Sequence, residues 1–140
     1  MDPVLRRSGR PLTVLIVEDQ VLVAMDHARM VREARGNVVG MVKSGEEAVE
    51  ATQRLRPDVV LLDIRLAGRI DGIEAAEAIT AVPGVALIII TASDDAATRK
   101  CASRFGALVL DKPVLPSTLR RAIADACALD SGTIGGAGQV

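Results

Sequence analysis

Five short apolar runs, rich in valine, leucine and isoleucine, recur along the sequence and constrain its fold more than any other feature. The segments between these runs instead carry apolar residues at helical spacing, three to four positions apart. Alternation of short apolar strands with amphipathic helices is typical of a parallel sheet that helices cover on both faces. The expected strands cover residues 12–17, 37–42, 58–63, 85–90 and 107–110.

Residues that begin and end helices mark the boundaries between these elements. Ser44 is followed three residues later by Glu47, which is the pattern of a helix-capping box. Asp71 and Asp94 stand where their carboxylates can cap the next two helices, and Gly106 ends the fourth helix. Because crossovers between parallel strands are right-handed, few topologies remain. We expect an α/β, flavodoxin-like, doubly wound (βα)5 fold whose five-stranded parallel sheet has the order 2-1-3-4-5.

The expected strands and helices form one domain over residues 12–129, which is long enough to bury a substantial core. Residues 1–11 form a basic arm that includes Arg6, Arg7 and Arg10, and we expect this arm to be flexible and solvated. Residues 130–140 are rich in glycine and carry no core-forming pattern, so we expect a flexible tail. We expect neither a signal peptide before this domain nor a second domain after it.

Composition excludes several classes of function. The chain has 17 basic and 18 acidic side chains, a balance that favours neither nucleic acid nor a membrane surface as a direct partner. No apolar run approaches the roughly 18 residues of a membrane-spanning helix. Cys101 and Cys127 are too few and too far apart for a disulfide framework or a zinc site, and they favour a reducing cytoplasm. The glycine-rich motifs of dinucleotide-binding and P-loop proteins are absent from the sequence.

Candidate functional groups follow four of the five expected strands. Glu18 and Asp19 come after the first strand, and Asp63 ends the third. Thr91 follows the fourth strand and Lys112 follows the fifth. Because ligands bind outside the carboxyl ends of the strands in open α/β sheets, these side chains are candidates for one common site. The first and third strands are neighbours in the expected order, so the acids are expected to meet in one crevice.

Carboxylates gathered in one crevice require compensating positive charge. Two of them about 4 Å apart repel by roughly 4 kcal/mol at an effective dielectric constant near 20. Lys112 can offset one charge, and the remainder favours a hard divalent cation. Since the donors are oxygens, Mg²⁺ or Mn²⁺ fits this site better than zinc. Asp63 can then act as a nucleophile in phosphoryl chemistry, with hydroxyl and ammonium groups on the phosphate oxygens.

The order and spacing of these residues resemble the receiver domain of response regulators in two-component signalling. The matching residues are Glu18-Asp19, Asp63, Thr91 and Lys112-Pro113. Asp63 follows Asp19 by 44 positions, and Thr91 follows Asp63 by 28. Lys112 follows Thr91 by 21 positions. Each motif is weak alone, but the full set in this order is highly specific. The resemblance covers about residues 12–129 and suggests a single-domain receiver.

The resemblance implies a role for each acid. Asp63 would accept a phosphoryl group from the phosphohistidine of a sensor histidine kinase or of a histidine phosphotransfer protein. Glu18, Asp19 and Asp63 would hold Mg²⁺, and the backbone carbonyl of Arg65 would complete the protein ligands. Such a domain catalyses its own phosphorylation and dephosphorylation, so the resemblance implies a signalling protein rather than an enzyme.

The resemblance also implies roles for residues after the last two strands. Thr91 and Lys112 would bind the phosphoryl oxygens, with Ser93 flanking the pocket. The Lys112–Pro113 peptide bond is typically cis in this family. One position departs from the family pattern. Val109 stands where the family usually has a tyrosine or phenylalanine, whose ring moves inward when the domain is phosphorylated. We expect Val109 to be a core residue, in which case the usual aromatic switch is missing.

Two other side chains invite a functional interpretation. Phe105 is the only aromatic residue, and we expect it to pack at a helix end rather than to replace the missing switch. His27 falls at helical spacing with Val23 and Met30, which favours a half-buried structural role. The alternative for His27 is a role in proton transfer or regulation.

Three functions are compatible with the sequence. The first is a phosphorylatable signalling module that alters binding of a downstream protein or serves as a phosphorelay shuttle or sink, as a monomer or a phosphorylation-dependent homodimer. The second is a Mg²⁺-dependent phosphatase or phosphotransferase in which Asp63 attacks small substrates. The third is a scaffold that works without phosphorylation. Retention of all acids and of Lys112 favours the first, and short loops argue against the second.

Overall fold

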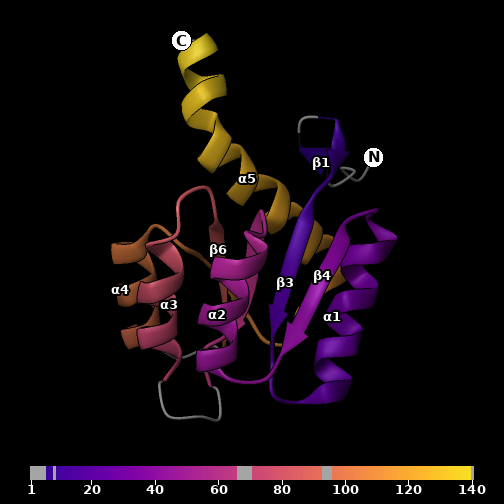
Figure 1. Ribbon diagram of the computed structural model, residues 1–140, viewed down its shortest axis with the longest axis vertical. Coiled ribbons are helices and arrows are strands. Elements are labelled where there is room, and N and C mark those ends of the chain that lie inside the picture. Colours follow the sequence, from indigo (N-terminus) through magenta and orange to yellow (C-terminus); the bar gives the residue numbers. More distant parts are fainter. Residues whose placement is uncertain (1–5, 8, 66–70, 93–95, 140) are drawn as a thin grey trace.

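The computed structural model describes residues 6–7, 9–65, 71–92 and 96–139, and it has the expected α/β architecture (Figure 1). The main sheet consists of five strands, β3 (Thr13–Val17), β4 (Asn37–Val42), β5 (Val59–Asp63), β6 (Ala86–Thr91) and β7 (Leu108–Asp111). All neighbouring strands in this sheet are parallel. Their order, β4-β3-β5-β6-β7, confirms the predicted 2-1-3-4-5 topology.

Helices cover both faces of the sheet. They are α1 (Val21–Glu33), α2 (Gly45–Leu55), α3 (Gly72–Thr80), α4 (Ala96–Phe105) and α5 (Pro116–Gln139). Side chains of α1 and α5 pack on one face, and side chains of α2, α3 and α4 pack on the other. Among these helices, none combines the length and apolar character that a bilayer crossing requires.

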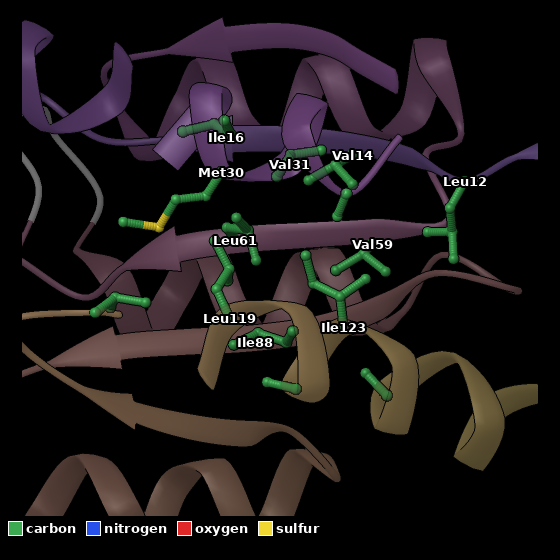
Figure 2. Packing of buried hydrophobic residues seen from close by; sticks show 14 of the residues in the cluster. Leu12, Val14, Ile16, Met30, Val31, Val59, Leu61, Ile88, Leu119 and Ile123 are labelled. Atoms are coloured by element: carbon green, nitrogen blue, oxygen red, sulfur yellow. The ribbon is translucent and has the colours of Figure 1, made fainter. Parts of the chain in front are cut away.

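The core consists of two layers because successive strand residues point to opposite faces of the sheet. Val14 and Ile16 of β3 face α1 and α5, whereas the residue after each of them faces α2, α3 and α4. Figure 2 shows the layer between the sheet and helices α1 and α5, to which Leu119 and Ile123 of α5 contribute beside Leu61 of β5. Full burial of each such side chain stabilises the fold by ~1.5–3 kcal/mol.

The predicted helix caps are present where the structure describes them. Ser44 Oγ accepts a hydrogen bond from the backbone N–H of Glu47 at 3.2 Å. Asp71 Oδ1 accepts from the N–H of Glu74 at 2.8 Å, and Glu74 Oε1 accepts from the N–H of Asp71 at 3.1 Å. The third predicted cap, Asp94, lies outside the described residues. Local hydrogen bonds therefore fix where α2 and α3 begin.

The N-terminal arm makes a specific contact that the sequence interpretation did not include. Short strands β1 (Arg6–Arg7) and β2 (Arg10–Pro11) pair antiparallel, and Arg10 reaches Asp58, which directly precedes β5. The Arg10 guanidinium donates to both carboxylate oxygens of Asp58, at 3.0 and 3.1 Å. The prediction that Arg10 is only solvated is therefore wrong, because the buried Asp58 carboxylate offers it an ionic partner.

The chain after residue 129 has a helical backbone. We predicted a flexible tail over residues 130–140, and the backbone of α5 continues as a helix to Gln139 and extends beyond the sheet (Figure 1). Glycine disfavours helix, whereas a proline would stop it, and no proline follows Pro116. The flexibility and the domain boundaries expected for both ends of the chain stay predictions.

Candidate functional site

The predicted site residues lie around the carboxyl end of β5. Asp63 is the last residue of this strand, which lies between β3 and β6 at the centre of the sheet. The four residues before Asp63 are apolar and buried, so the strand has side chains of its own in both core layers. Asp63 itself is buried, with 2% of its surface exposed. A buried carboxylate requires polar partners, because water does not solvate it there.

Both oxygens of the Asp63 carboxylate have such partners. Oδ1 accepts a hydrogen bond from the backbone N–H of Arg65 at 3.0 Å. Oδ2 accepts from Nζ of Lys112 at 3.0 Å, and this ion pair links the end of β5 to the segment after β7. The Lys112–Pro113 peptide bond is cis, as the resemblance implied. The structure therefore brings Asp63 and Lys112 into direct contact.

Two more acids come from the neighbouring strand. Glu18 and Asp19 directly follow β3, which pairs with β5. One carboxylate oxygen from each of Glu18, Asp19 and Asp63 lies within 4.8 Å of the other two. This convergence follows from the strand order, because parallel neighbours end at the same edge of the sheet. The cluster that the sequence predicted is thus present in the fold.

The buried position of Glu18 in this cluster shifts its pKa. Burial raises the pKa of Glu18 to about 7, and the nearby Asp63 and Asp19 add to this effect, while a hydrogen bond from the Gln20 N–H opposes it. Its Oε2 accepts that hydrogen bond at 3.1 Å. Its Oε1 is buried and has no hydrogen-bond partner among the described residues. An oxygen-rich cluster with an unpaired buried acceptor matches the ligand preference of a hard divalent cation.

Thr91 supplies a hydroxyl group at the end of the next strand. It ends β6, where the preceding residue, Ile90, pairs with Asp63. Thr91 is buried, and its Oγ1 has no hydrogen-bond partner within the part of the chain that the structure describes. The backbone of Thr91 is fixed, because its carbonyl accepts from the N–H of Lys112 at 2.9 Å. The hydroxyl is thus available for a further oxygen ligand.

The position of the usual aromatic switch contains a valine that packs against the sheet. Val109 pairs with Ile89 and is partly buried against the core layer that faces α2, α3 and α4. It also lines a groove of about 440 Å³ between β7 and α5. Phe105 ends α4 and packs against the same layer, with the Arg104 guanidinium 4.9 Å from its ring centroid. Both residues thus behave as the packing residues that the sequence predicted.

One contact near the site was missed by the sequence interpretation. Arg99 of α4 forms an ion pair with Asp111, the last residue of β7 and the neighbour of Lys112. Its two members come from different elements and from no recognised motif, so the sequence carried no signal for it. Ser93, predicted to flank the pocket, lies outside the described residues.

Comparisons with known proteins agree with this geometry. Residues 14–124 match the family model described as response regulator receiver domain. The transcriptional regulatory protein PdtaR of Mycobacterium tuberculosis is 40% identical over 82 residues, which cover 59% of this chain and 40% of PdtaR. Protein-glutamate methylesterase/protein-glutamine glutaminase 4 of Myxococcus xanthus is 40% identical over 112 residues, 77% of this chain and 31% of that protein. This chain thus spans less than half the length of either relative.

A solved structure extends the similarity to the whole fold. The signal receiver domain of a modulated diguanylate cyclase from Desulfovibrio desulfuricans G20 has a TM-score of 0.81 and 37% sequence identity. The match covers 88% of this chain and 98% of that one. The shared unit is therefore an entire receiver fold rather than a local motif.

Proposed function

This chain belongs to the response regulator receiver domain family, and from this membership we propose that Asp63 is its phosphoacceptor. The observation that carries the proposal is that the Asp63 carboxylate lies close to two other acids, Glu18 and Asp19, and also pairs with the Lys112 ammonium group. An aspartate in such surroundings has one cation beside it and a site for a second. Phosphoryl transfer requires little more from a protein than this positioning and charge compensation.

The acidic cluster supports Mg²⁺, or Mn²⁺, as the cofactor. Glu18, Asp19 and Asp63 would hold the ion, and the backbone carbonyl of Arg65 would complete the set. When bound, the ion supplies the positive charge that offsets the developing charge on the phosphoryl oxygens. The carbonyl of Arg65 remains a proposed ligand, supported by the hydrogen bond from the N–H of the same residue to Asp63.

The proposed reaction is nucleophilic attack by an Asp63 oxygen on the phosphorus atom of a phosphohistidine. The new P–O bond forms as the P–N bond breaks, and the electron pair passes to the donor imidazole, which takes up a proton. Lys112 then moves its hydrogen bond from Asp63 to a phosphoryl oxygen, and the Thr91 hydroxyl donates to another. Later attack by water on phosphorus releases inorganic phosphate and restores the carboxylate.

An apolar patch beside the site supports a protein as the phosphoryl donor. Val21, Leu22 and Met25 are exposed on the first turns of α1, and Leu115 is exposed before α5. A groove of about 650 Å³ is lined by Leu22, by Val114 and by Lys112. Exposed apolar patches of this kind mark protein interaction sites. We propose that a sensor histidine kinase or a histidine phosphotransfer protein binds this patch.

Output from this receiver is proposed to be altered binding of a downstream protein or service in a phosphorelay. A monomer and a phosphorylation-dependent homodimer are both compatible with this role. We also propose a cytoplasmic location, since Cys101 and Cys127 are thiols rather than a disulfide. Direct nucleic acid binding is not part of the proposal, because the chain has a net charge of −1.

Phosphorylation by a small donor tests the proposal. The purified chain is incubated with Mg²⁺ and acetyl phosphate and then weighed by intact-protein mass spectrometry, with Asp63→Asn and a metal chelator as controls. We expect the mass of one added phosphoryl group on the wild-type protein only when Mg²⁺ is present. A wild-type protein that gains no phosphoryl group, or an Asp63→Asn protein that gains one equally, would contradict the assignment.

A further inference from the structure

The single histidine of the chain lies close to the proposed phosphoryl site. His27 is on the face of α1 that packs against the sheet, and only 5% of its surface is exposed. It lines the groove of about 650 Å³ together with Lys112, Pro113 and Val114. The groove places the imidazole beside the segment that delivers the Lys112 ammonium group to Asp63.

The alternation of strand residues puts Asp63 on the side of the sheet that α1 and His27 cover. Val59 and Leu61 belong to the core layer under α1 and α5, and Asp63 is the next residue of this alternation. The other buried residues on this face of α1 include Ala24, Ala28 and Val31, which are apolar. An ionisable side chain in this row therefore adds a chemical property that core packing does not require.

Charged groups act on His27 from three elements. Burial lowers the pKa of His27, Asp26 on α1 and Asp63 on β5 raise it, and Lys112 after β7 lowers it. The other residues that line the groove are apolar. Burial therefore favours the neutral imidazole of His27, and the pKa of His27 is sensitive to the same two charges that form the phosphoryl site.

We propose that His27 is a positioning residue for Lys112 and that its protonation is linked to the charge on Asp63. The neutral imidazole leaves Lys112 directed at Asp63 without a like charge beside it. A protonated imidazole repels the ammonium group and attracts the negative charge on Asp63. The electrostatic link between His27, Lys112 and Asp63 does not depend on phosphorylation. Its consequence, which is regulation of the site by pH, rests on the proposed role of Asp63 as phosphoacceptor.

The consequence follows from thermodynamic linkage. A phosphoryl group adds negative charge at Asp63, so phosphorylation is expected to raise the pKa of His27. Coupling between two sites is reciprocal, so protonation of His27 favours the phosphorylated form by the same factor. A protonated imidazole also stabilises the charge of the phosphorylated protein before it reacts, so we expect acidification through this titration to slow loss of the phosphoryl group.

Nuclear magnetic resonance can test the electrostatic link directly, because one histidine gives one imidazole signal set. The signal is titrated with pH in the full chain without divalent ions, in the wild type and in Lys112→Met and Asp63→Asn. We expect the pKa of His27 to rise in Lys112→Met and to fall in Asp63→Asn, each by about 0.3–1 unit. Lys100→Met, which removes an exposed lysine of α4, is the matched control and is expected to cause no shift.

Equal His27 pKa values in Lys112→Met and Lys100→Met would overturn the proposal. This readout involves no phosphorylation, so failure of Asp63 as phosphoacceptor is a separate result. A second measurement follows loss of the phosphoryl group with saturating Mg²⁺ from pH 5.5 to 8, in the wild type, His27→Gln and His27→Leu. We expect both substitutions to abolish the same part of the pH dependence, and profiles identical to wild type would also contradict the link.

Discussion

At the scale of single residues, the position of Glu18 is unfavourable for folding but suited to metal binding. Its carboxylate is buried beside two other acids, and one of its oxygens has no hydrogen-bond partner within the described residues. The repulsion between such neighbours amounts to roughly 3–4 kcal/mol per pair at an effective dielectric constant near 20. The fold tolerates this cost because the same arrangement provides ligands for a divalent cation.

The raised pKa of Glu18 predicts an unusual pH dependence of stability. Because its pKa rises from 4.5 to about 7 on folding, the folded state binds a proton that the unfolded state releases in this range. The free energy of unfolding without Mg²⁺ should therefore fall by about 3 kcal/mol as pH rises from 4.5 to 7. Glu18→Gln removes this part of the fall, which urea unfolding in the presence of a chelator measures.

Magnesium provides the control for this prediction. Mg²⁺ at 100 times its dissociation constant should stabilise the wild-type protein by about 2.7 kcal/mol, with tighter binding above pH 7 than below it. Unfolding curves of Glu18→Gln and wild type that respond identically to pH and to Mg²⁺ would show that Glu18 neither titrates in this range nor binds the ion.

The types of the site residues could be predicted from sequence, but their electrostatics could not. Asp63, Thr91 and Lys112 follow apolar runs that end at one edge of a parallel sheet, so their convergence is a consequence of topology. The pKa of Glu18 and the approach of His27 depend on burial and on distances between strands and α1. Such quantities arise only after the chain has packed.

At the scale of elements, the start of α3 is packed tightly against the segment that follows β5. A Cβ atom at Gly72 would lie 2.2 Å from the carbonyl oxygen of Ile64. Ile64 stands between Asp63 and Arg65, whose N–H donates to the Asp63 carboxylate. The absence of a side chain at Gly72 thus allows α3 to approach the site backbone.

Gly72→Ala should therefore disturb both stability and the site. We expect a loss of about 1–3 kcal/mol, because the clash is with backbone, and slower phosphorylation of Asp63 by acetyl phosphate. Gly40→Ala is the matched control, since its Cβ would meet the flexible end of Leu15 at 3.1 Å. Similar losses of stability in the two variants would argue against the close approach of α3.

A second element-scale contact anchors the N-terminal hairpin to the amino end of the sheet. Burial would raise the pKa of Asp58, but hydrogen bonds from Arg10 and Thr13 outweigh this effect and hold it below its ordinary value. The Thr13 N–H and Oγ1 both donate to Asp58 Oδ2, at 2.8 and 3.0 Å. Asp58 thus holds β2, β3 and β5 together.

Asp58→Ala should cost about 2–3 kcal/mol in urea unfolding, since it leaves the partly buried donors of Thr13 without their acceptor. Arg10→Gln should cost less than about 1 kcal/mol, because the arginine side chain is 53% exposed. The lowered pKa means that the Asp58 contribution is complete above about pH 4 and is lost as pH falls further. A larger loss in Arg10→Gln than in Asp58→Ala would contradict this account.

The strands and helices were predictable because each has a local sequence pattern. The contacts of Gly72 with Ile64 and of Arg10 with Asp58 have no such pattern. Apolar runs and caps such as Ser44 and Asp71 determine the elements through interactions within a few residues. Arg10 and Asp58 are 48 positions apart, and neither belongs to a periodic pattern. The continuation of α5 over a glycine-rich segment likewise opposes intrinsic helix propensity.

At the scale of the whole molecule, α5 contributes side chains to the core layer that it shares with α1 and the sheet. The residues of α5 in the core are Leu119, Ala122, Ile123, Ala126 and Cys127. The sequence predicts that the domain ends at residue 129, so removal of residues 130–140 should change the free energy of unfolding by less than about 1 kcal/mol. Leu119→Ala, by contrast, should cost about 2–5 kcal/mol, and a comparable loss in the truncated chain would refute the proposed boundary.

The whole fold serves to bring ends of separate strands together at one point. β3 and β5 supply the acids, β6 supplies Thr91, and the segment after β7 supplies Lys112. The central claim is that this point binds a divalent cation against Asp63. The direct measurement is anomalous X-ray scattering from crystals grown with Mn²⁺. We predict one manganese peak bonded to Glu18, Asp19 and Asp63, whereas manganese bound elsewhere, with this cluster empty, would contradict the account.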